Sequence, residues 1–143
     1  MFIGEYTHKI DEKGRVALPA KFRGDLASGA VVTRGLDQAL YLYTKAEWEE
    51  IAERLAALPL SVSHARDIQR MMLAGAVEVE PDRQGRVLLP PHLREHAKLS
   101  GEVVVAGLYK RIELWSVDAW SAASQRTEAS ADEIAEHLHS LGI

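Results

Sequence analysis

The sequence contains no cysteine among its 143 residues, and it has no long apolar run. The absence of cysteine excludes disulfides, thiolate zinc sites and cysteine nucleophiles. A membrane helix needs roughly 18 consecutive apolar residues, and apolar runs such as Val103–Ala106 are far shorter. The segment Met1–Glu5 shows neither a basic stretch nor an apolar core, so no secretory signal is expected. These absences predict a cytoplasmic protein without membrane contact.

Positive charge is also in short supply over the whole chain. Lys and Arg number 17 against 21 Asp and Glu, which gives a net charge of −4. A sum of this sign argues against a nucleic-acid partner unless the charges are unevenly distributed. The excess lies in the last 17 residues, where four acidic side chains stand without any Lys or Arg. The first 126 residues hold 17 basic and 17 acidic side chains, so the body of the protein is neutral.

The most informative feature is an internal repeat. Residues 11–23 align with residues 82–94 at an offset of 71, and seven of these 13 positions are identical. The similarity resumes further along the chain at an offset of 72, where Trp48 matches Trp120. A half of this size would have only a thin core of its own. We therefore expect the two halves to pack together about a pseudo-two-fold axis as one domain.

Each half shows the same succession of expected elements. A β-rich segment leads into an Asp-x-x-Gly-Arg turn, a short strand and a short helix that begins near Pro19 or Pro90. Two further β-rich runs and a closing helix follow. Between the halves, Ser61 or Ser63 is the candidate cap of a helix that stops at Gly75. The expected β-rich runs are Ile3–Ile10, Ala30–Thr33, Ala39–Tyr43, Ala76–Glu80, Glu102–Ala106 and Arg111–Trp115.

The predicted fold class is α+β, with two sequence-related βαββα-type halves. The expected divisions of the chain are a first repeat (1–58), a linking helix (59–75), a second repeat (76–126) and an acidic C-terminal helix (127–143). In that last segment, Ser130–Glu133 has the pattern of a capping box, and Ile134, Leu138 and Leu141 recur at helical spacing. This apolar stripe is expected to pack on the body or on a neighbouring subunit.

The Asp-x-x-Gly-Arg turn is the strongest candidate for a functional site. Asp11–Arg15 suits a three-residue hairpin loop in which Gly14 takes a left-handed conformation. Asp11 and Arg15 then face each other, and their ion pair fixes the plane of the guanidinium. A hairpin of this kind can enter a DNA groove, with lysine at phosphates and arginine at a guanine edge. A well-made turn with a purely structural ion pair is the alternative.

Cationic side chains around the first turn favour the DNA interpretation. The second copy repeats the turn between Asp82 and Arg86 and adds Arg83, but Gln84 replaces the tip lysine and acidic residues precede it, so the first copy is expected to dominate. The candidate DNA contacts are Lys9, Lys13, Arg15, Lys21, Arg23, Arg83 and Arg86. The residues expected to orient the loops are Asp11, Gly14, Asp82 and Gly85.

Other chemistries have weaker support in the sequence. The six histidines include the pairs His92/His96 and His137/His139. Neither pair has a third and a fourth ligand nearby, so ordinary surface histidines explain them better than a metal site. No Gly-x-Ser-x-Gly, Walker or dinucleotide-binding motif occurs. We therefore expect no metal, no cofactor and no enzymatic activity.

Several segments together resemble one known family. The chain closely resembles the MraZ family of bacterial transcriptional regulators. The resemblance is carried by Met1–Tyr6, Ile10–Val16 and Leu18–Arg23, by the second turn at Asp82–Arg86 and by the segment Trp115–Trp120. The resemblance covers essentially the full length. It implies a fold related to the AbrB-like swapped-hairpin β-barrels, in which one chain supplies both halves and helices flank the barrel.

The resemblance also implies a function. It implies a nucleoid-associated repressor that binds double-stranded DNA at short direct repeats upstream of the division and cell-wall gene cluster, including its own gene. It implies a homo-oligomeric ring in which many weak hairpins act together. An AbrB-like protein-interaction or antitoxin-type scaffold is the alternative. If DNA is the partner, the acidic tails are expected to face away from it and Lys13 and Arg15 toward it.

Overall fold

A computed structural model describes all 143 residues, and its two halves share one order of elements. The first half consists of β1 (Phe2–Lys9), β2 (Arg15–Ala17), α1 (Ala20–Leu26), β3 (Ala30–Arg34), β4 (Leu40–Thr44) and α2 (Lys45–Ala56). The connection is formed by α3 (Ser63–Gln69) and the π-helical turn η1 (Arg70–Ala74). The second half and the C-terminal segment consist of β5 (Val77–Val79), β6 (Arg86–Leu88), α4 (Pro91–Ala97), β7 (Glu102–Tyr109), β8 (Ile112–Ser116), α5 (Val117–Ala129) and α6 (Ala131–His139).

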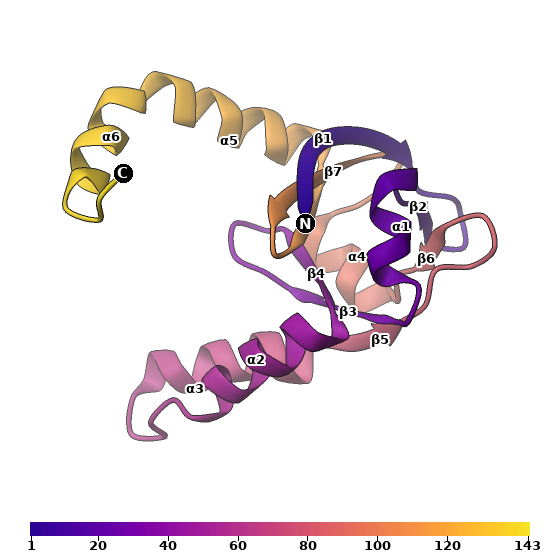
Figure 1. Cartoon of the computed structure of the whole chain (residues 1–143), viewed down its shortest axis with the longest axis horizontal. Coiled ribbons are helices and arrows are strands. Elements are labelled where there is room, and N and C mark those ends of the chain that lie inside the picture. The colour runs from indigo at the N-terminus through magenta and orange to yellow at the C-terminus, as the bar shows by residue number, and fades with distance from the viewer.

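The strands of the two halves interleave (Figure 1). An antiparallel six-stranded sheet has the order β1-β7-β8-β4-β3-β5, and β2 pairs with β6 in a separate ladder. Strand β1 of the first half therefore pairs with β7 of the second half, and β5 of the second half pairs with β3 of the first. Only the ladders β3–β4 and β7–β8 stay within one half. The mixed α+β class with two similar halves is thus confirmed, and the halves form one folding unit.

The strand registers define a pseudo-two-fold axis. In the β2–β6 ladder Val16 pairs with Val87, its own counterpart at the offset of 71. In the β4–β8 ladder Tyr41 pairs with Glu113, its counterpart at the offset of 72. A residue that pairs with its own counterpart lies on the symmetry axis. The axis therefore passes through both ladders, in agreement with the packing expected from the repeat.

The hydrophobic core lies between the large sheet, the β2–β6 ladder and the helices α1 and α4. Phe22 of α1 and Leu93 of α4 occupy equivalent positions, and both are fully buried. Phe22 makes edge-to-face contacts with Phe2 and Tyr6, with ring centroids 5.3 and 5.6 Å apart. Both halves thus contribute to the same core, which supplies the burial that each half lacks on its own.

The hydrogen-bonded ladders do not close into a barrel. Strands β1 and β5 form the two edges of the large sheet, and no ladder joins them. A single bridge between Ile10 and Val16 connects the end of β1 to β2. The ladders therefore show no closed barrel, and the short strands β2 and β6 pair with each other instead of continuing the sheet at its edges.

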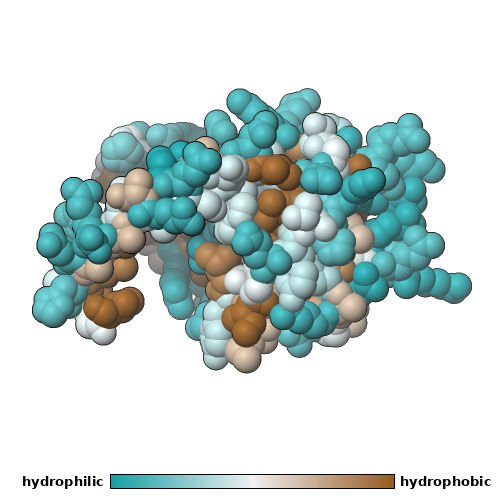
Figure 2. Space-filling model, turned by 90° about the horizontal axis from the view of Figure 1, so that it is seen from above, coloured by the Kyte–Doolittle hydropathy of each residue, from teal (hydrophilic) through white to brown (hydrophobic).

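Two helical arms leave the body on the side away from β2 and β6 (Figure 1). One arm consists of α2, α3 and η1, and the other of α5 and α6. Seen from above, the surface is largely hydrophilic with scattered apolar patches, and hydrophilic side chains cover the end opposite the arms (Figure 2). None of the helices combines the length and the apolar character that crossing a membrane requires.

Two expected helix caps are wrong. Helix α3 begins after Val62, whose extended backbone makes it the N-cap residue, and neither Ser61 nor Ser63 caps the helix through its side chain. Ser130 stands at the N-cap of α6 but makes no capping hydrogen bond. Helix α5 ends directly before Ser130, and the backbone of Ser130 has ψ = 15°, whereas a capping residue needs an extended backbone. The expected capping box is therefore not formed.

The caps that the sequence analysis did not anticipate lie at equivalent positions of the two halves. Thr44 accepts a hydrogen bond from the N–H of Glu47 at the start of α2. Ser116 accepts one from the N–H of Ala119 at the start of α5. Both cap residues end a strand with an extended backbone, so the strand passes directly into the helix. This shared geometry orients both arms relative to the sheet.

Candidate nucleic-acid interface

The first loop, Asp11–Arg15, is organised by the carboxylate of Asp11. Its Oδ1 accepts hydrogen bonds from the backbone N–H groups of Lys13 and Arg15, at 3.0 and 2.9 Å. Its Oδ2 accepts a hydrogen bond from Nε of Arg15 at 2.7 Å. The turn closes through the N–H of Gly14, which donates to the carbonyl of Asp11 at 3.0 Å. Because Nε alone makes the ion pair, the two terminal nitrogens of Arg15 remain available to a ligand.

The second loop, Asp82–Arg86, has the same geometry. Oδ1 of Asp82 accepts from the backbone N–H groups of Gln84 and Arg86, both at 2.9 Å. Oδ2 of Asp82 accepts from Nε of Arg86, also at 2.9 Å. Gly85 donates to the carbonyl of Asp82 at 2.9 Å. Both copies therefore form the expected hairpin turn with its carboxylate–guanidinium pair.

The two loops lie side by side at the end of the molecule opposite the arms (Figure 1). The pairing of β2 with β6 brings them there, although 71 residues separate them in the sequence. Nη1 of Arg86 lies 4.0 Å from Oδ2 of Asp11, the same oxygen that accepts the hydrogen bond from Nε of Arg15. The ion pairs of the two loops thus adjoin, and the molecule presents two guanidinium groups on one surface.

Glycine is required in both loops directly before the arginine. Gly14 has φ = 89° and Gly85 has φ = 74°, a conformation that L side chains rarely adopt. A Cβ atom on Gly14 would also lie only 2.8 Å from the carbonyl oxygen of Leu89. The two glycine carbonyls accept backbone hydrogen bonds from the opposite half, Gly14 from Leu89 at 2.8 Å and Gly85 from Leu18 at 2.9 Å. Each loop is therefore fastened to the other half.

The loop hydrogen bonds lower the pKa of both aspartates. For Asp11 the largest cause is the backbone N–H of Arg15, and the guanidinium of Arg15 acts in the same direction against a desolvation effect. For Asp82 the backbone N–H of Arg86 is likewise the largest cause of the lowered pKa. Both groups are acids that the folded loop stabilises in the charged form. The carboxylates therefore hold their arginines throughout the neutral range.

We expect acid to release both loops only below the ordinary aspartate pKa of 3.8. A carboxylate whose pKa is lowered by folding stabilises the loop above its unfolded-state pKa, and that contribution is lost as the pH falls through the lowered value. A ¹³C NMR titration of the Asp11 and Asp82 carboxyl groups measures both midpoints. Midpoints at or above 3.8 for both groups would contradict the hydrogen-bonded geometry.

The tips of the two loops are exposed but differ in charge. Lys13 of the first loop and Arg83 of the second are both exposed, as is Lys9 at the end of β1. Gln84 stands at the position equivalent to Lys13, and Glu80 at the position equivalent to Lys9. Exposed Glu12 stands at the position equivalent to Arg83, so residues 11–15 are neutral whereas residues 82–86 carry one positive charge. Only the flanking position, Lys9 against Glu80, is more positive in the first copy, and the dominance of the first loop stays a prediction.

Two further predicted DNA contacts already have partners within the protein. The ammonium group of Lys21 lies 5.2 Å from the ring centroid of Tyr6, a cation–π contact. Arg23 is half-buried and donates its Nε to the carbonyl oxygen of Leu18 at 2.9 Å. Arg94, the counterpart of Arg23, donates to the equivalent carbonyl oxygen at 3.0 Å. Arg94 is not among the residues predicted from the sequence, although the repeat alignment pairs it with Arg23.

The acidic tail lies far from the loops. In Figure 1, α6 and the C terminus are at the left, and the loops beside β2 and β6 are at the right. The acidic side chains of the tail are Glu128, Asp132, Glu133 and Glu136. The arrangement agrees with the expectation that the tail points away from the surface formed by Lys13 and Arg15. The net charge therefore says little about that surface.

The sequence of this chain has many relatives. A sequence model of the family described as "MraZ protein, putative antitoxin-like" matches residues 1–71 and again residues 72–140. The chain belongs to the MraZ family. A protein named "Transcriptional regulator MraZ" from Caldanaerobacter subterraneus subsp. tengcongensis is 50% identical over 143 residues, which cover 100% of both chains. A protein of the same name from Herpetosiphon aurantiacus is 47% identical over 143 residues, which cover 100% of both chains. Another, from Carboxydothermus hydrogenoformans, is 48% identical over 138 residues, which cover 96% of both chains.

Membership of the MraZ family agrees with the expectation that the chain is not an enzyme, because the relatives are named as regulators. The histidine pair on α4 has structural partners instead. Nε2 of His92 lies 3.0 Å from the carbonyl oxygen of Gly75, and Nε2 of His96 lies 3.0 Å from that of Gly35. These two side chains fasten α4 to the end of η1 and to the loop after β3.

This MraZ family member also has a buried polar network on the face of the large sheet opposite the main core, which the sequence did not predict. Glu113, only 6% exposed, accepts hydrogen bonds from Nε of Arg111 and from Nε1 of Trp115, each at 2.9 Å. The guanidinium of Arg111 lies 4.9 Å from the ring centroid of Tyr41. The network satisfies the buried carboxylate. Its position on the pseudo-two-fold axis indicates a role in joining the halves.

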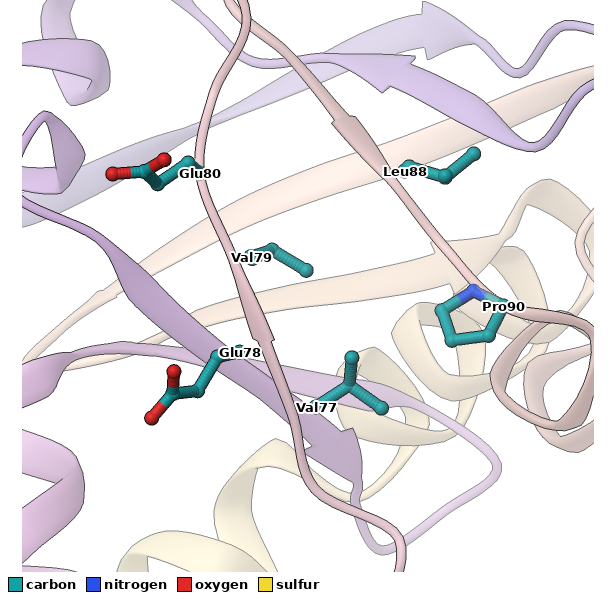
Figure 3. A pocket seen from close by; sticks show the side chains of 6 residues that line it. All are labelled: Val77, Glu78, Val79, Glu80, Leu88 and Pro90. Carbon is teal, nitrogen blue, oxygen red and sulfur yellow. The ribbon is translucent and has the colours of Figure 1, made fainter.

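An apolar groove lies where β5 and β6 diverge behind the second loop (Figure 3). Its volume is about 280 Å³. The residues that line it are Val77, Glu78, Val79, Glu80, Leu88 and Pro90. In Figure 3 the two valines point toward β6 and Pro90, whereas the two glutamates point to the opposite side of β5. The groove therefore has an apolar floor and lies beside an acidic strand face.

Proposed function

We propose that this chain is a DNA-binding transcriptional regulator whose two hairpin loops contact DNA. The observation that carries the proposal is the adjacent pair of loops, in which Asp11 and Asp82 each accept a hydrogen bond from Nε of the arginine of their own loop. The loops lie on a hydrophilic end of the molecule, away from the acidic tail. The relatives, which are named as transcriptional regulators, support the same function.

The chemistry of the loops suits the major groove. A two-stranded ribbon fits this groove, and guanine presents O6 and N7 there to a bidentate arginine. Both terminal nitrogens of Arg15 are free for such a contact, and Nη2 of Arg86 is free as well, while Nη1 of Arg86 lies 4.0 Å from Oδ2 of Asp11. The exposed Lys13 and Arg83 are suited to phosphates, which fix the orientation of the protein on the duplex. The exposed Lys9 adds a positive charge beside the first loop.

We also propose which genes the protein regulates and how it assembles. The chain acts as a cytoplasmic, nucleoid-associated repressor of the division and cell-wall gene cluster, including its own gene, and binds short direct repeats upstream. It works as a homo-oligomeric ring, because tethered loops on one duplex multiply a weak affinity. The exchange of strands between the halves supports an AbrB-like swapped-hairpin relationship. The proposed divisions of the chain are a first repeat (1–58), a linking segment (59–75), a second repeat (76–126) and an acidic segment (127–143).

A salt series with operator DNA tests this function. The probe is a duplex taken from directly upstream of the protein's own gene, and a shuffled duplex of equal length is the control. We expect tighter binding to the first duplex and a log–log salt slope of about −1.8 per bound protomer, since Lys13 and Arg83 each neutralise one phosphate. A flat salt response, or equal affinity for both duplexes, would contradict the proposal.

A protein-interaction scaffold of the antitoxin type is the second candidate. The apolar groove between β5 and β6 favours it, because Leu88 is 55% exposed and exposed apolar patches mark interaction sites. In that case the loop arginines have only a structural role. Folded protein that shifts no upstream duplex even at low salt would favour this candidate over the regulator.

A further inference from the structure

The first loop rests against an arginine of the opposite half. Arg94 of α4 donates Nε to the carbonyl oxygen of Leu89 at 3.0 Å. Its guanidinium covers Gly14 so closely that a Cβ atom there would lie 2.8 Å from Nε and 3.0 Å from Cζ. The N–H of Leu89 donates to the carbonyl of Gly14 at 2.8 Å. Arg94 and Leu89 thus hold the first loop by its glycine.

The second loop is held in the same way from the first half. Arg23 of α1 donates Nε to the carbonyl oxygen of Leu18 at 2.9 Å. The guanidinium of Arg23 is the group nearest to Gly85, in contact with the place a Cβ atom would take. The N–H of Leu18 donates to the carbonyl of Gly85 at 2.9 Å. The arrangement therefore occurs twice, on both sides of the pseudo-two-fold axis.

We propose that Arg94 and Arg23 are positioning residues for DNA binding, each holding the loop of the opposite half. The inference rests on the proposed function of the loops. It gives Arg23, which the sequence analysis placed among the direct DNA contacts, a supporting role. The Nε of each arginine is engaged by a carbonyl, and each guanidinium packs on a glycine backbone.

Positioning matters because the loop tips have no side chains in the core. A loop that is already ordered loses less conformational entropy when it binds, which increases affinity. Gly14 directly precedes Arg15, so a guanidinium that restrains Gly14 also restrains the backbone of Arg15. Loss of Arg94 is therefore expected to disorder Arg15 in the first half, and to leave Arg86 of its own half in place.

Hydrogen exchange of the DNA-free protein tests the cross-half connection directly. Arg94→Met keeps the length of the side chain and removes its donors. Amides of the first loop, Asp11–Arg15, are expected to exchange about tenfold faster in this variant, and those of the second loop, Asp82–Arg86, at the parent rate. Arg54→Met on α2 removes the same charge far from the loops and is the matched control. Faster exchange in the second loop only, or in neither loop, overturns the inference.

Operator binding separates positioning from direct contact. Arg94→Met is expected to lower the affinity about tenfold without changing the salt slope, because no phosphate contact is lost. A salt slope that becomes less steep by about 0.9 per protomer identifies Arg94 as a phosphate contact and overturns its positioning role. Arg54→Met is expected to bind like the parent protein.

A double-mutant cycle shows through which loop Arg94 acts. In an Arg15→Ala background, Arg94→Met is expected to lower affinity by less than about threefold, because its target is already gone. In an Arg86→Ala background the tenfold effect is retained. Equal effects in both backgrounds overturn the inference. If Arg15→Ala itself binds like the parent, the proposed function fails, and the hydrogen-exchange result still decides whether Arg94 holds the first loop.

Discussion

Replacing Arg15 with alanine is expected to lower the affinity for operator DNA by about 100-fold. A bidentate arginine–guanine contact contributes about 1–3 kcal/mol of discrimination, and every protomer on the same duplex loses it together. The turn itself is expected to persist, because Asp11 still accepts the backbone N–H groups of Lys13 and of residue 15. Fluorescence anisotropy with a labelled upstream duplex measures the affinity, and circular dichroism and mass in solution establish that fold and assembly are unchanged.

Three further variants define what this result means. Arg126→Ala removes the same charge from α5, at the opposite end of the molecule, and is expected to bind like the parent. Arg15→Lys keeps the charge but loses the planar fork, so the salt slope is retained while the preference for operator over shuffled DNA falls. Arg86→Ala is expected to have a smaller effect than Arg15→Ala. Operator affinity of Arg15→Ala equal to that of the parent would refute the assignment of the first loop to DNA.

Truncation to alanine is expected to lower the free energy of unfolding by about 3–5 kcal/mol for Phe22 and by about 2–5 kcal/mol for Leu93. Both side chains are buried, with 1% and 0% exposure, and Phe22 also loses its edge-to-face contacts with Phe2 and Tyr6. The two residues belong to different halves, yet they share one core. We therefore expect each variant to unfold in a single shifted transition. Urea unfolding followed by circular dichroism and tryptophan fluorescence measures it.

The control for the core variants is a truncation at an exposed apolar position. Leu60, 74% exposed in the connection between α2 and α3, is expected to change stability by less than about 0.5 kcal/mol when replaced by alanine. A parent protein that unfolds in two steps, of which Phe22→Ala moves only one, would show that the halves have separate cores and would contradict the interleaved sheet as the basis of stability.

The internal geometry of the loops was predictable because its causes are local. Asp11, Gly14 and Arg15 lie within five residues, and a hairpin of that length leaves few ways to satisfy a carboxylate, a guanidinium and a left-handed backbone position. Because the sequence motif is repeated, the geometry predicted for the first loop also predicts that of the second. The strands were predictable for a similar reason, since runs such as Ala30–Thr33 show their β character in the residues themselves.

The partners of these elements were not predictable from the same signals. Nothing near Arg94 in the sequence indicates that its guanidinium packs on Gly14, which lies 80 positions earlier in the other half. The exchange of β5 and β1 between the halves is equally invisible, because local patterns define a strand but not its neighbour. The failed cap at Ser130 had a tertiary cause as well, since the preceding helix fixes its backbone.

The pseudo-two-fold axis through the β2–β6 ladder relates the two loops that are proposed to contact DNA. A strictly two-fold protomer would bind a duplex equally well after a half-turn about its axis. Here the frame is symmetric but the tips are not, because Gln84 stands at the counterpart of Lys13 and Glu80 at that of Lys9. If the loops contact DNA as proposed, the two orientations differ in free energy and each protomer prefers one of them. Successive protomers with the same heading match an asymmetric sequence repeated in one direction, and not a palindrome.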